Sequence, residues 1–239
     1  MSTGSLAAVG SGEYLPSMLE LESLLISDGI KRGKQPVFVQ LATAAGRESE
    51  ERRDYWRMLG QDQADRLGVE ARCLPVFGRA EAESHEFVDA VRDAALIYFS
   101  GGDPNHLANS MRDTILWQAI QENFNTGGSL AGCSAGAMFM SDQVPRIRFT
   151  TSPPVAGVGL LSHIQVIPHF NMIHRFIPDA VVRALSDVPD GVTLIGIDDE
   201  TSMVRREDAW SVVGKGRVHI LNGDEPRTFE HSEHITALG

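Results

Sequence analysis

A serine lies at the centre of the pentapeptide Gly132-Cys133-Ser134-Ala135-Gly136, which has the pattern G-x-S-x-G. This pattern is typical of a sharp turn between a strand and a helix, which projects the serine above the carboxyl end of a sheet. The free N–H groups of the following helix point at the same place, where they can stabilise an oxyanion. The pattern therefore predicts acyl-transfer chemistry with Ser134 as nucleophile. The alternative is a helix start made of small residues that pack tightly on the sheet.

A serine nucleophile needs a base, and His169 is the best placed of the eight histidines. It follows a predicted strand over residues 163–168, at the sheet end where open α/β sheets bind their ligands. We interpret His106, His163 and His174 as surface or capping residues. Because His163, His169 and His174 fall on different elements, without paired-cysteine or HxxxH support, we expect no metal site and no cofactor.

A base histidine is usually oriented by a carboxylate, and the strand predicted over residues 192–197 is followed by three acids. These acids are Asp198, Asp199 and Glu200. Side chains alternate along an extended strand, so Asp199 is expected to point opposite to its two neighbours. The alternative is a solvated acidic loop or a helix cap.

Glycines follow two of the predicted strands. Gly101 and Gly102 would let backbone N–H groups approach a ligand closely, as a second oxyanion donor. Asp103 is expected to cap the helix that begins at Pro104. Residues 10–13 (GSGE) resemble half of a dinucleotide fingerprint, but the third glycine is missing and no acid ends the second strand. We therefore reject nucleotide binding.

Short apolar runs alternate with amphipathic stretches in the first 140 residues. Strands are predicted over residues 6–10, 36–41, 69–76, 95–99 and 129–132, and helices over 17–31, 48–67, 85–94, 104–123 and from 135. This alternation favours an α/β fold with a mostly parallel sheet and helices on both faces.

The second half of the sequence has a different pattern. A helix is expected over residues 175–185, and residues 209–221 read as two strands joined by a tight turn at 214–216. The sheet is therefore expected to end in an antiparallel C-terminal edge. No linker or repeat interrupts the sequence, so we expect one domain over residues 1–239.

The 239-residue chain carries a formal net charge of −11. Such a surface repels phosphate backbones and anionic lipid, so neither nucleic acid nor a membrane is expected as a partner. Two cysteines cannot make a disulfide framework, and we find no signal peptide, so a cytoplasmic location is expected. A homodimer is compatible with the sequence, which does not determine the oligomeric state.

The order of these motifs resembles that of the peptidase E and cyanophycinase family of serine peptidases. The matching stretches are GSGE (10–13), FSGGD (99–103), AGCSAGA (131–137), PHF (168–170) and GIDDET (196–201). The resemblance implies a flavodoxin-like sheet akin to the class I glutamine amidotransferases and a Ser-His-acid triad in that chain order. It implies Ser134 as nucleophile, His169 as base, and an oxyanion hole made by Gly102 and the N–H of Ala135.

The resemblance has two departures. The acid of the family is usually a glutamate in an Ile-Asp-Glu stretch, a position that Asp199 occupies here, so the acid stays open between Asp199 and Glu200. Cyanophycinases also carry a glutamine soon after the glycine pair and an arginine-rich stretch after His-Phe, of which only Arg175 is present. This argues against a specialised cyanophycin hydrolase, although Arg175 could still clamp a carboxylate.

We therefore expect a cofactor-free serine peptidase that cleaves small peptides, such as Asp-X dipeptides or related isopeptides, through an acyl-enzyme. One alternative is an amidotransferase-like amidase or esterase that uses Cys133 or Ser134, although Cys133 lies one residue before the centre of the turn. The other is a binding protein that keeps the fold without catalysis.

Overall fold

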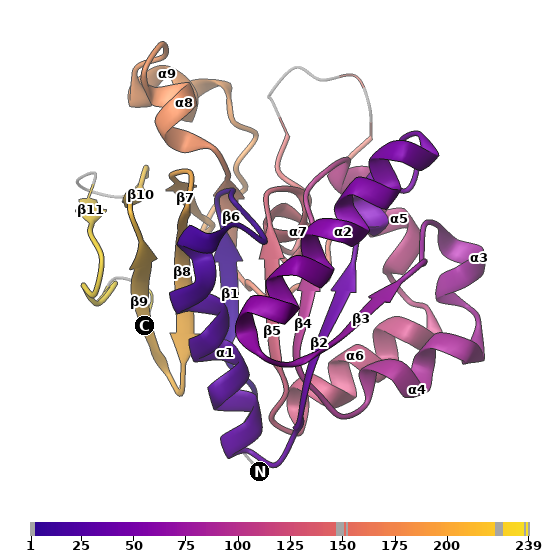
Figure 1. Cartoon of the computed structure of the whole chain (residues 1–239). Helices are drawn as coiled ribbons and strands as arrows, with labels where there is room; N and C mark the ends of the chain where they lie inside the picture. Colours follow the sequence, from indigo (N-terminus) through magenta and orange to yellow (C-terminus); the bar gives the residue numbers. More distant parts are fainter. Residues whose placement is uncertain (1–2, 147–150, 152, 223–226, 237, 239) are drawn as a thin grey trace.

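The computed structural model describes residues 3–146, 151, 153–222, 227–236 and 238 (Figure 1). Its larger sheet has seven strands within this part of the chain. In spatial order they are β3 (Glu70–Leu74), β2 (Gln35–Leu41), β4 (Ala94–Phe99), β5 (Ser129–Cys133), β1 (Leu6–Val9), β8 (Thr201–Arg206) and β9 (Ala209–Gly214). The strands from β3 to β1 are parallel, and β8 and β9 add an antiparallel edge. The predicted fold class is confirmed.

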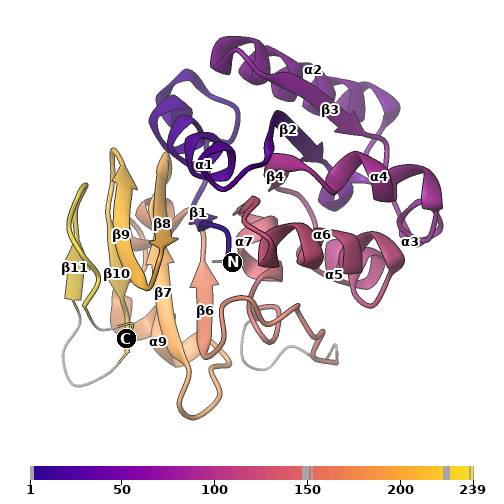
Figure 2. The ribbon, with the colours of Figure 1, turned by 90° about the horizontal axis from the view of Figure 1, so that it is seen from below.

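Helices cover both faces of this sheet, with α1 and α2 on one side and α5, α6 and α7 on the other (Figure 2). The α-helices are α1 (Leu19–Lys31), α2 (Glu50–Leu67), α3 (Arg79–Ala82), α4 (Val88–Val91), α5 (Pro104–Met111), α6 (Ile115–Asn125), α7 (Ala135–Phe139), α8 (Phe170–His174) and α9 (Asp179–Leu185). The 3₁₀ helices are η1 (Pro16–Met18), η2 (Thr43–Ala45) and η3 (His85–Phe87). Because helices pack on both faces, the central strands are buried throughout, which explains the continuous apolar run in β4.

Two apolar cores lie on opposite faces of the larger sheet. Strand β1 contributes to both, since Leu6 and Ala8 pack in one core while Ala7 and Val9 pack in the other. This is the alternation that an extended strand imposes on its side chains. It anchors β1 beside β5, so the loops that follow these two strands leave the sheet next to each other.

A second sheet has four strands within the described residues and holds most of the C-terminal part of the chain. In spatial order they are β11 (Arg227–Phe229), β10 (Val218–Ile220), β7 (Thr193–Ile197) and β6 (Ile164–Ile167). Strands β6 and β7 are parallel. Helices α8 and α9 lie beyond the upper ends of these strands in Figure 1. The chain passes from this sheet to the larger one between β7 and β8, at residues 198–200.

The prediction of a hairpin over residues 209–221 is wrong. Strand β9 pairs with β8, while β10 pairs with β7 and β11, so the two expected hairpin strands belong to different sheets. The true hairpin joins β8 to β9 through Glu207 and Asp208, and Glu207 has a positive φ of 55°. The strand that pairs with β9, residues 201–206, is one that the sequence patterns do not predict.

Two helices that the periodicity predicts as single are each divided. The helix expected over 104–123 is α5 and α6, separated at Asp113, whose φ is 63°, with Thr114 capping α6 through the N–H of Trp117. The helix expected over 175–185 is α8, which starts earlier, and α9, which begins after Pro178. Proline suits the position before α9 because its ring fixes φ, and because the N–H that it lacks would have no acceptor within the helix there.

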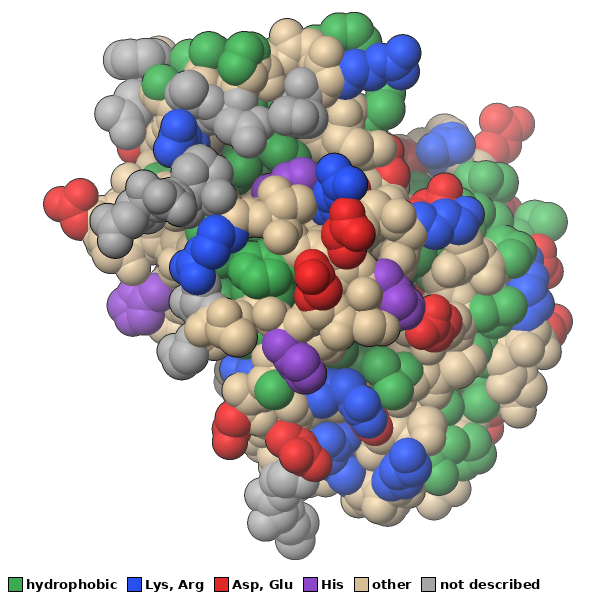
Figure 3. All heavy atoms as spheres, turned by 90° about the vertical axis from the view of Figure 1, so that its left-hand side faces the viewer, with side chains coloured by type: hydrophobic (Ala, Val, Ile, Leu, Met, Phe, Trp, Pro, Cys, Tyr) green, Lys and Arg blue, Asp and Glu red, His purple; other side chains and the backbone are tan. Residues whose placement is uncertain are grey.

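The face that carries the C-terminal strands mixes acidic, basic and histidine side chains, with no stripe of one sign (Figure 3). None of the helices in the described residues combines the length and apolar character that a membrane span requires. The single-domain organisation of residues 1–239 stays a prediction.

Candidate active site

Ser134 occupies a strained turn between β5 and α7. Its φ and ψ are 49° and −108°, a conformation that few residues with a side chain adopt. The turn is held because the N–H of Ser134 donates to the carbonyl of Val9 at 2.9 Å. It also needs a glycine at position 132, where a Cβ would lie 2.5 Å from the carbonyl carbon of Gly136. The backbone therefore presents the Ser134 hydroxyl at the carboxyl end of the sheet, as the pentapeptide predicts.

His169 meets this hydroxyl from the other sheet. It lies two residues after β6, at the start of α8, with a positive φ of 54°. Its Nε2 is 3.0 Å from the Oγ of Ser134. Its Nδ1 is 2.8 Å from Oδ1 of Asp199. The structure thus brings the expected nucleophile and the expected base into hydrogen-bonding distance.

Asp199 is held in place by three neighbours. Besides His169, the hydroxyl of Ser11 donates to Oδ1 at 2.5 Å, and the N–H of Asp199 donates to Oδ1 of Asn171 at 3.0 Å. Partial burial opposes ionisation, but the hydrogen bonds from Ser11 and His169 outweigh it and lower the pKa of Asp199. An ionised Asp199 requires the proton of neutral His169 on Nδ1, which leaves Nε2 as the acceptor for the Ser134 hydroxyl.

Glu200, the other candidate acid, points elsewhere. Its φ is 52°, and its carboxylate pairs with the Nζ of Lys215 at 2.6 Å. The hydrogen bond from Lys215 is the main cause of its lowered pKa. Asp198 takes a third direction, with Oδ2 accepting the N–H of Arg217 and Oδ1 lying 3.1 Å from Nε2 of His219. Of the three consecutive acids, Asp199 is the one that the structure places beside His169.

Two backbone N–H groups are available near Ser134. Within the described residues, neither the N–H of Gly102 nor that of Ala135 has a hydrogen-bond acceptor. The N–H of Gly101, by contrast, donates to Oε1 of Glu13 at 2.8 Å. A carbonyl oxygen at Ser134 could therefore receive hydrogen bonds from Gly102 and Ala135 but not from Gly101.

Asp103 and Arg175, the remaining expected site residues, do not contact the Ser-His-Asp group through any described hydrogen bond or ion pair. Asp103 caps α5 by accepting the N–H groups of Asn105 and His106 at 2.9 and 3.0 Å. Arg175 ends α8, with its guanidinium carbon 5.8 Å from the ring centroid of Phe176. Asp103 thus acts as the predicted helix cap.

The other histidines lie outside this group. Nε2 of His106 is 2.8 Å from the carbonyl of Phe77, and the N–H of His163 donates to Asp142. The side chain of His174 is outside the described residues. Across the described residues no cluster of three His, Cys, Asp or Glu side chains could hold a metal ion.

Cys133 is buried behind the turn. Its Sγ donates to Oε2 of Glu13 at 2.9 Å. Burial, reinforced by the nearby carboxylate of Glu13, raises the pKa of the Cys133 thiol well above its ordinary value. The sulfur therefore stays a neutral thiol, which is a poor nucleophile.

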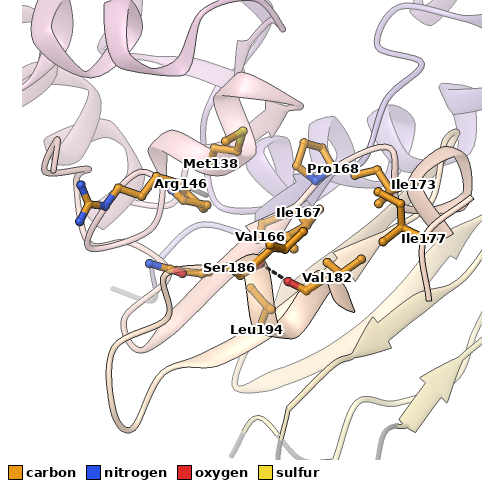
Figure 4. A pocket seen from close by; sticks show the side chains of 13 residues that line it. Met138, Arg146, Val166, Ile167, Pro168, Ile173, Ile177, Val182, Ser186 and Leu194 are labelled. Carbon is orange, nitrogen blue, oxygen red and sulfur yellow. Dashed lines mark hydrogen bonds between the residues drawn. The ribbon is translucent and has the colours of Figure 1, made fainter. Parts of the chain in front are cut away.

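An apolar cavity of about 320 Å³ adjoins the site (Figure 4). Pro168 in its wall directly precedes His169, and Met138 follows Ser134 by one turn of α7. The other lining residues come from β6, β7, α8, α9 and the loops beside them, and are Pro145, Arg146, Gln165, Val166, Ile167, Ile173, Ile177, Val182, Leu185, Ser186 and Leu194.

Ser11, Glu13 and Asn171 lie in or beside the sequence motifs, but the sequence alone predicts no role for them. The structure places Ser11 and Asn171 on Asp199, and Glu13 on Gly101 and Cys133. One signal could have pointed to Ser11 and Glu13, because residues 10–13 directly follow β1. Strand β1 lies beside β5, so the loop after β1 lies next to the turn that carries Ser134.

Known proteins resemble this chain over most of its length. A crystal structure of a peptidase from an acI-B1 Actinobacterium is 52% identical, with a TM-score of 0.91, and the match covers 98% of this chain and 96% of that one. A peptidase E-like protein from Listeria monocytogenes EGD-e is 16% identical, with a TM-score of 0.63, over 90% of this chain and 100% of that one, and shows the shared fold.

A cyanophycinase from Geminocystis herdmanii (strain PCC 6308) is 28% identical over 171 residues, which is 68% of this chain and 62% of that protein. The chain thus spans less than two thirds of this relative. The profile of peptidase family S51 matches residues 6–213. The resemblance predicted from the motifs is confirmed, and the chain belongs to peptidase family S51.

Proposed function

We propose that this chain is a serine peptidase that hydrolyses small peptides through an acyl-enzyme on Ser134. The observation that carries the proposal is the continuous relay from Ser134 to His169 to Asp199, with donor–acceptor distances of 3.0 and 2.8 Å. A nucleophile, a base and an orienting acid within hydrogen-bonding distance are the arrangement that activates a serine. Membership of a peptidase family supports the same reaction.

In the proposed reaction, Nε2 of His169 takes the proton of Ser134 as Oγ attacks the carbonyl carbon of the peptide bond. The carbonyl oxygen becomes an oxyanion and receives hydrogen bonds from the N–H groups of Gly102 and Ala135. The proton on His169 passes to the leaving amine when the C–N bond breaks. Water then attacks the acyl-enzyme with His169 again as base, releasing the acid and restoring Ser134. Asp199 stays ionised and stabilises the imidazolium.

We propose substrates with an acidic residue on the N-terminal side of the cleaved bond, such as Asp-X dipeptides or related isopeptides. The exposed Arg175, six residues after His169, supports an acidic group in the substrate. The arginine-rich stretch of cyanophycinases is missing, which supports a smaller substrate than cyanophycin. The apolar cavity would accommodate the aliphatic part of the residue on one side of the cleaved bond.

Two alternatives have less support. A reaction through Cys133 is disfavoured because this thiol is buried, donates to Glu13 and has a raised pKa. A catalytically silent binding protein would not need the base within 3.0 Å of the serine. The cytoplasmic location, the absence of nucleic-acid and membrane partners, and a homodimer stay predictions.

Labelling with a fluorophosphonate probe tests the proposal, because this probe phosphonylates an activated serine. We expect the wild-type chain to be labelled and Ser134→Ala to be unlabelled while keeping its circular dichroism spectrum. Cys133→Ala, which removes the alternative nucleophile, should still be labelled. Labelling of folded Ser134→Ala at the wild-type level, or no labelling of the wild type, would contradict the proposal.

A further inference from the structure

The loop after β1 carries a carboxylate that contacts the active-site turn and that the proposed mechanism does not use. Glu13 is 8% exposed, and its two oxygens have different partners. Oε1 accepts the N–H of Gly101 at 2.8 Å, and Oε2 accepts the thiol of Cys133 at 2.9 Å. One side chain thus links the loop after β4 to the residue that precedes the nucleophile.

Both contacts are suited to a buried carboxylate. A buried acidic group is costly unless donors satisfy its oxygens, and here each oxygen has one donor. The Cys133 thiol keeps its proton because burial and the Glu13 carboxylate raise its pKa, so its S–H is available to donate.

The position of Glu13 decides which backbone N–H of the glycine loop is available. Of three consecutive N–H groups, that of Gly101 donates to Glu13, and that of Asp103 donates to the carbonyl of Ala44 at 2.9 Å. Within the described residues, the intervening N–H of Gly102 has no acceptor. The loop is therefore fixed on both sides of the N–H group of Gly102.

Close packing makes this fixation sensitive to Glu13. A Cβ built on Gly101 would lie 2.9 Å from Oε1 of Glu13 and 3.3 Å from Cβ of Ser134. The loop after β4, the carboxylate and the nucleophile thus meet at one point. Removal of the Glu13 side chain would free the N–H of Gly101 and leave space into which the loop can move.

We propose that Glu13 is a positioning residue that holds the N–H of Gly102 beside that of Ala135, so that both donate to the oxyanion formed at Ser134. The inference rests on the proposed function, because it requires that Ser134 be acylated. Glu13 acts through Gly101 and Gly102 and does not touch the substrate. The transition state depends on this alignment more than the bound substrate does, because the negative charge on oxygen develops during the reaction.

The test is the second-order rate constant for labelling of Ser134 by a fluorophosphonate in the full chain, because the P=O oxygen of the probe takes the place of the oxyanion. Loss of one oxyanion donor typically lowers a rate by about 10²–10³-fold, so we expect Glu13→Ala to react roughly 10²-fold more slowly. Glu13→Gln should stay within about fivefold of the wild type, because its amide oxygen can still accept the N–H of Gly101.

A cleaved dipeptide gives a second readout that a purely structural role would not produce. Glu13→Ala should lower kcat by the factor seen in labelling, while KM stays within about twofold of the wild-type value. Equal labelling of Glu13→Ala and the wild type, or a Glu13→Gln rate as low as that of Glu13→Ala, would overturn the proposal.

Glu22→Gln is the matched control, since Glu22 is a buried acid on the α1 side of the same sheet that bonds to Gln63 and not to the glycine loop. We expect it to be labelled at the wild-type rate. If Glu13→Ala fails to fold, the labelling rate of Glu13→Asp takes its place in the test. Aspartate is one methylene too short to bridge both partners, so we expect this variant to be labelled more slowly than the wild type. A wild-type rate for Glu13→Asp overturns the role of Glu13, whereas an unlabelled wild type overturns the proposed function itself.

Discussion

The two halves of the chain contribute to the candidate site in different ways. The first half supplies Ser134 and the N–H groups of Gly102 and Ala135 from turns at the ends of neighbouring parallel strands, so backbone geometry fixes them. The second half supplies His169 and Asp199 from the ends of β6 and β7 in the smaller sheet. These two side chains reach the nucleophile only through side-chain hydrogen bonds. We therefore expect the alignment of His169 and Asp199 with Ser134 to be easier to disturb than the backbone turns of the first half.

The loop after β1 connects the two halves. The hydroxyl of Ser11 binds Asp199, its carbonyl accepts the N–H of Glu200 at 3.1 Å, and the N–H of Gly10 donates to the carbonyl of Thr201 at 2.9 Å. Asp199 itself lies where the chain crosses from β7 to β8, that is, from one sheet to the other. The relative position of His169 and Ser134 therefore depends on residues 10–13 and 198–201.

Among substitutions in the second half of the chain, removal of His169 should lower kcat the most. We expect His169→Ala to lower kcat by about 10⁴-fold or more, because Ser134 then has no group to accept its proton. His106→Ala is the control, since His106 bonds to the carbonyl of Phe77 and lies outside the relay. Steady-state cleavage of a dipeptide identified from a peptide library measures both variants. Activity of His169→Ala within tenfold of the wild type would contradict the relay.

A substitution of the acid tests which of the two consecutive candidates orients the base. Asp199→Asn should lower kcat by roughly 10³–10⁴-fold, because an amide favours the wrong tautomer of His169. Glu200→Gln should change kcat by less than about twofold, since Glu200 is half-buried and pairs with the exposed Lys215. The ratio of the two kcat values is the measurement. A larger loss in Glu200→Gln than in Asp199→Asn would show that the acid has been assigned to the wrong residue.

Ser11→Ala should weaken the link between the halves without breaking the relay. Asp199 would lose one hydrogen bond that lowers its pKa, and we expect kcat to fall about tenfold. Ser129→Ala is the control, because it removes a buried hydroxyl that bonds to Leu25 at the opposite end of β5. An unchanged kcat in Ser11→Ala would mean that His169 and Asn171 are enough to hold Asp199.

The smallest effect on activity is expected at a buried acid of the first half. Burial raises the pKa of Glu22 from 4.5 to about 8, so between these values the unfolded chain binds fewer protons than the folded chain. The free energy of unfolding should therefore fall as the pH rises from about 4.5 to about 8, and then level off. Urea unfolding at several pH values should show a flatter profile for Glu22→Gln, with unchanged activity. Parallel profiles for the two proteins would contradict a neutral Glu22.

The first half of the fold could be predicted well because its signals are local. The apolar run of β4, the pentapeptide around Ser134 and the alternation of strands with helices each lie within a short stretch of sequence. The position of His169 at a sheet end could be predicted for the same reason, since it lies two residues after the end of β6. The predicted antiparallel edge is also present.

The remaining features depend on contacts between distant residues. Strand β9 pairs with β8 and not with β10, and no turn signal in residues 209–221 reveals that choice. The acid could not be chosen because it depends on the positive φ of Glu200 and on Lys215, which directs the Glu200 carboxylate away from His169. Ser11 and Glu13 were missed because their partners lie 88 to 188 positions away along the chain.

The most direct test of the relay is peptide mapping by mass spectrometry of the wild-type chain after reaction with a fluorophosphonate. We predict one adduct, on Ser134, formed much faster in the wild-type chain than in His169→Ala. An adduct on another residue, or a Ser134 adduct formed equally fast in His169→Ala, would contradict the claim that the two halves of the chain act together on this serine.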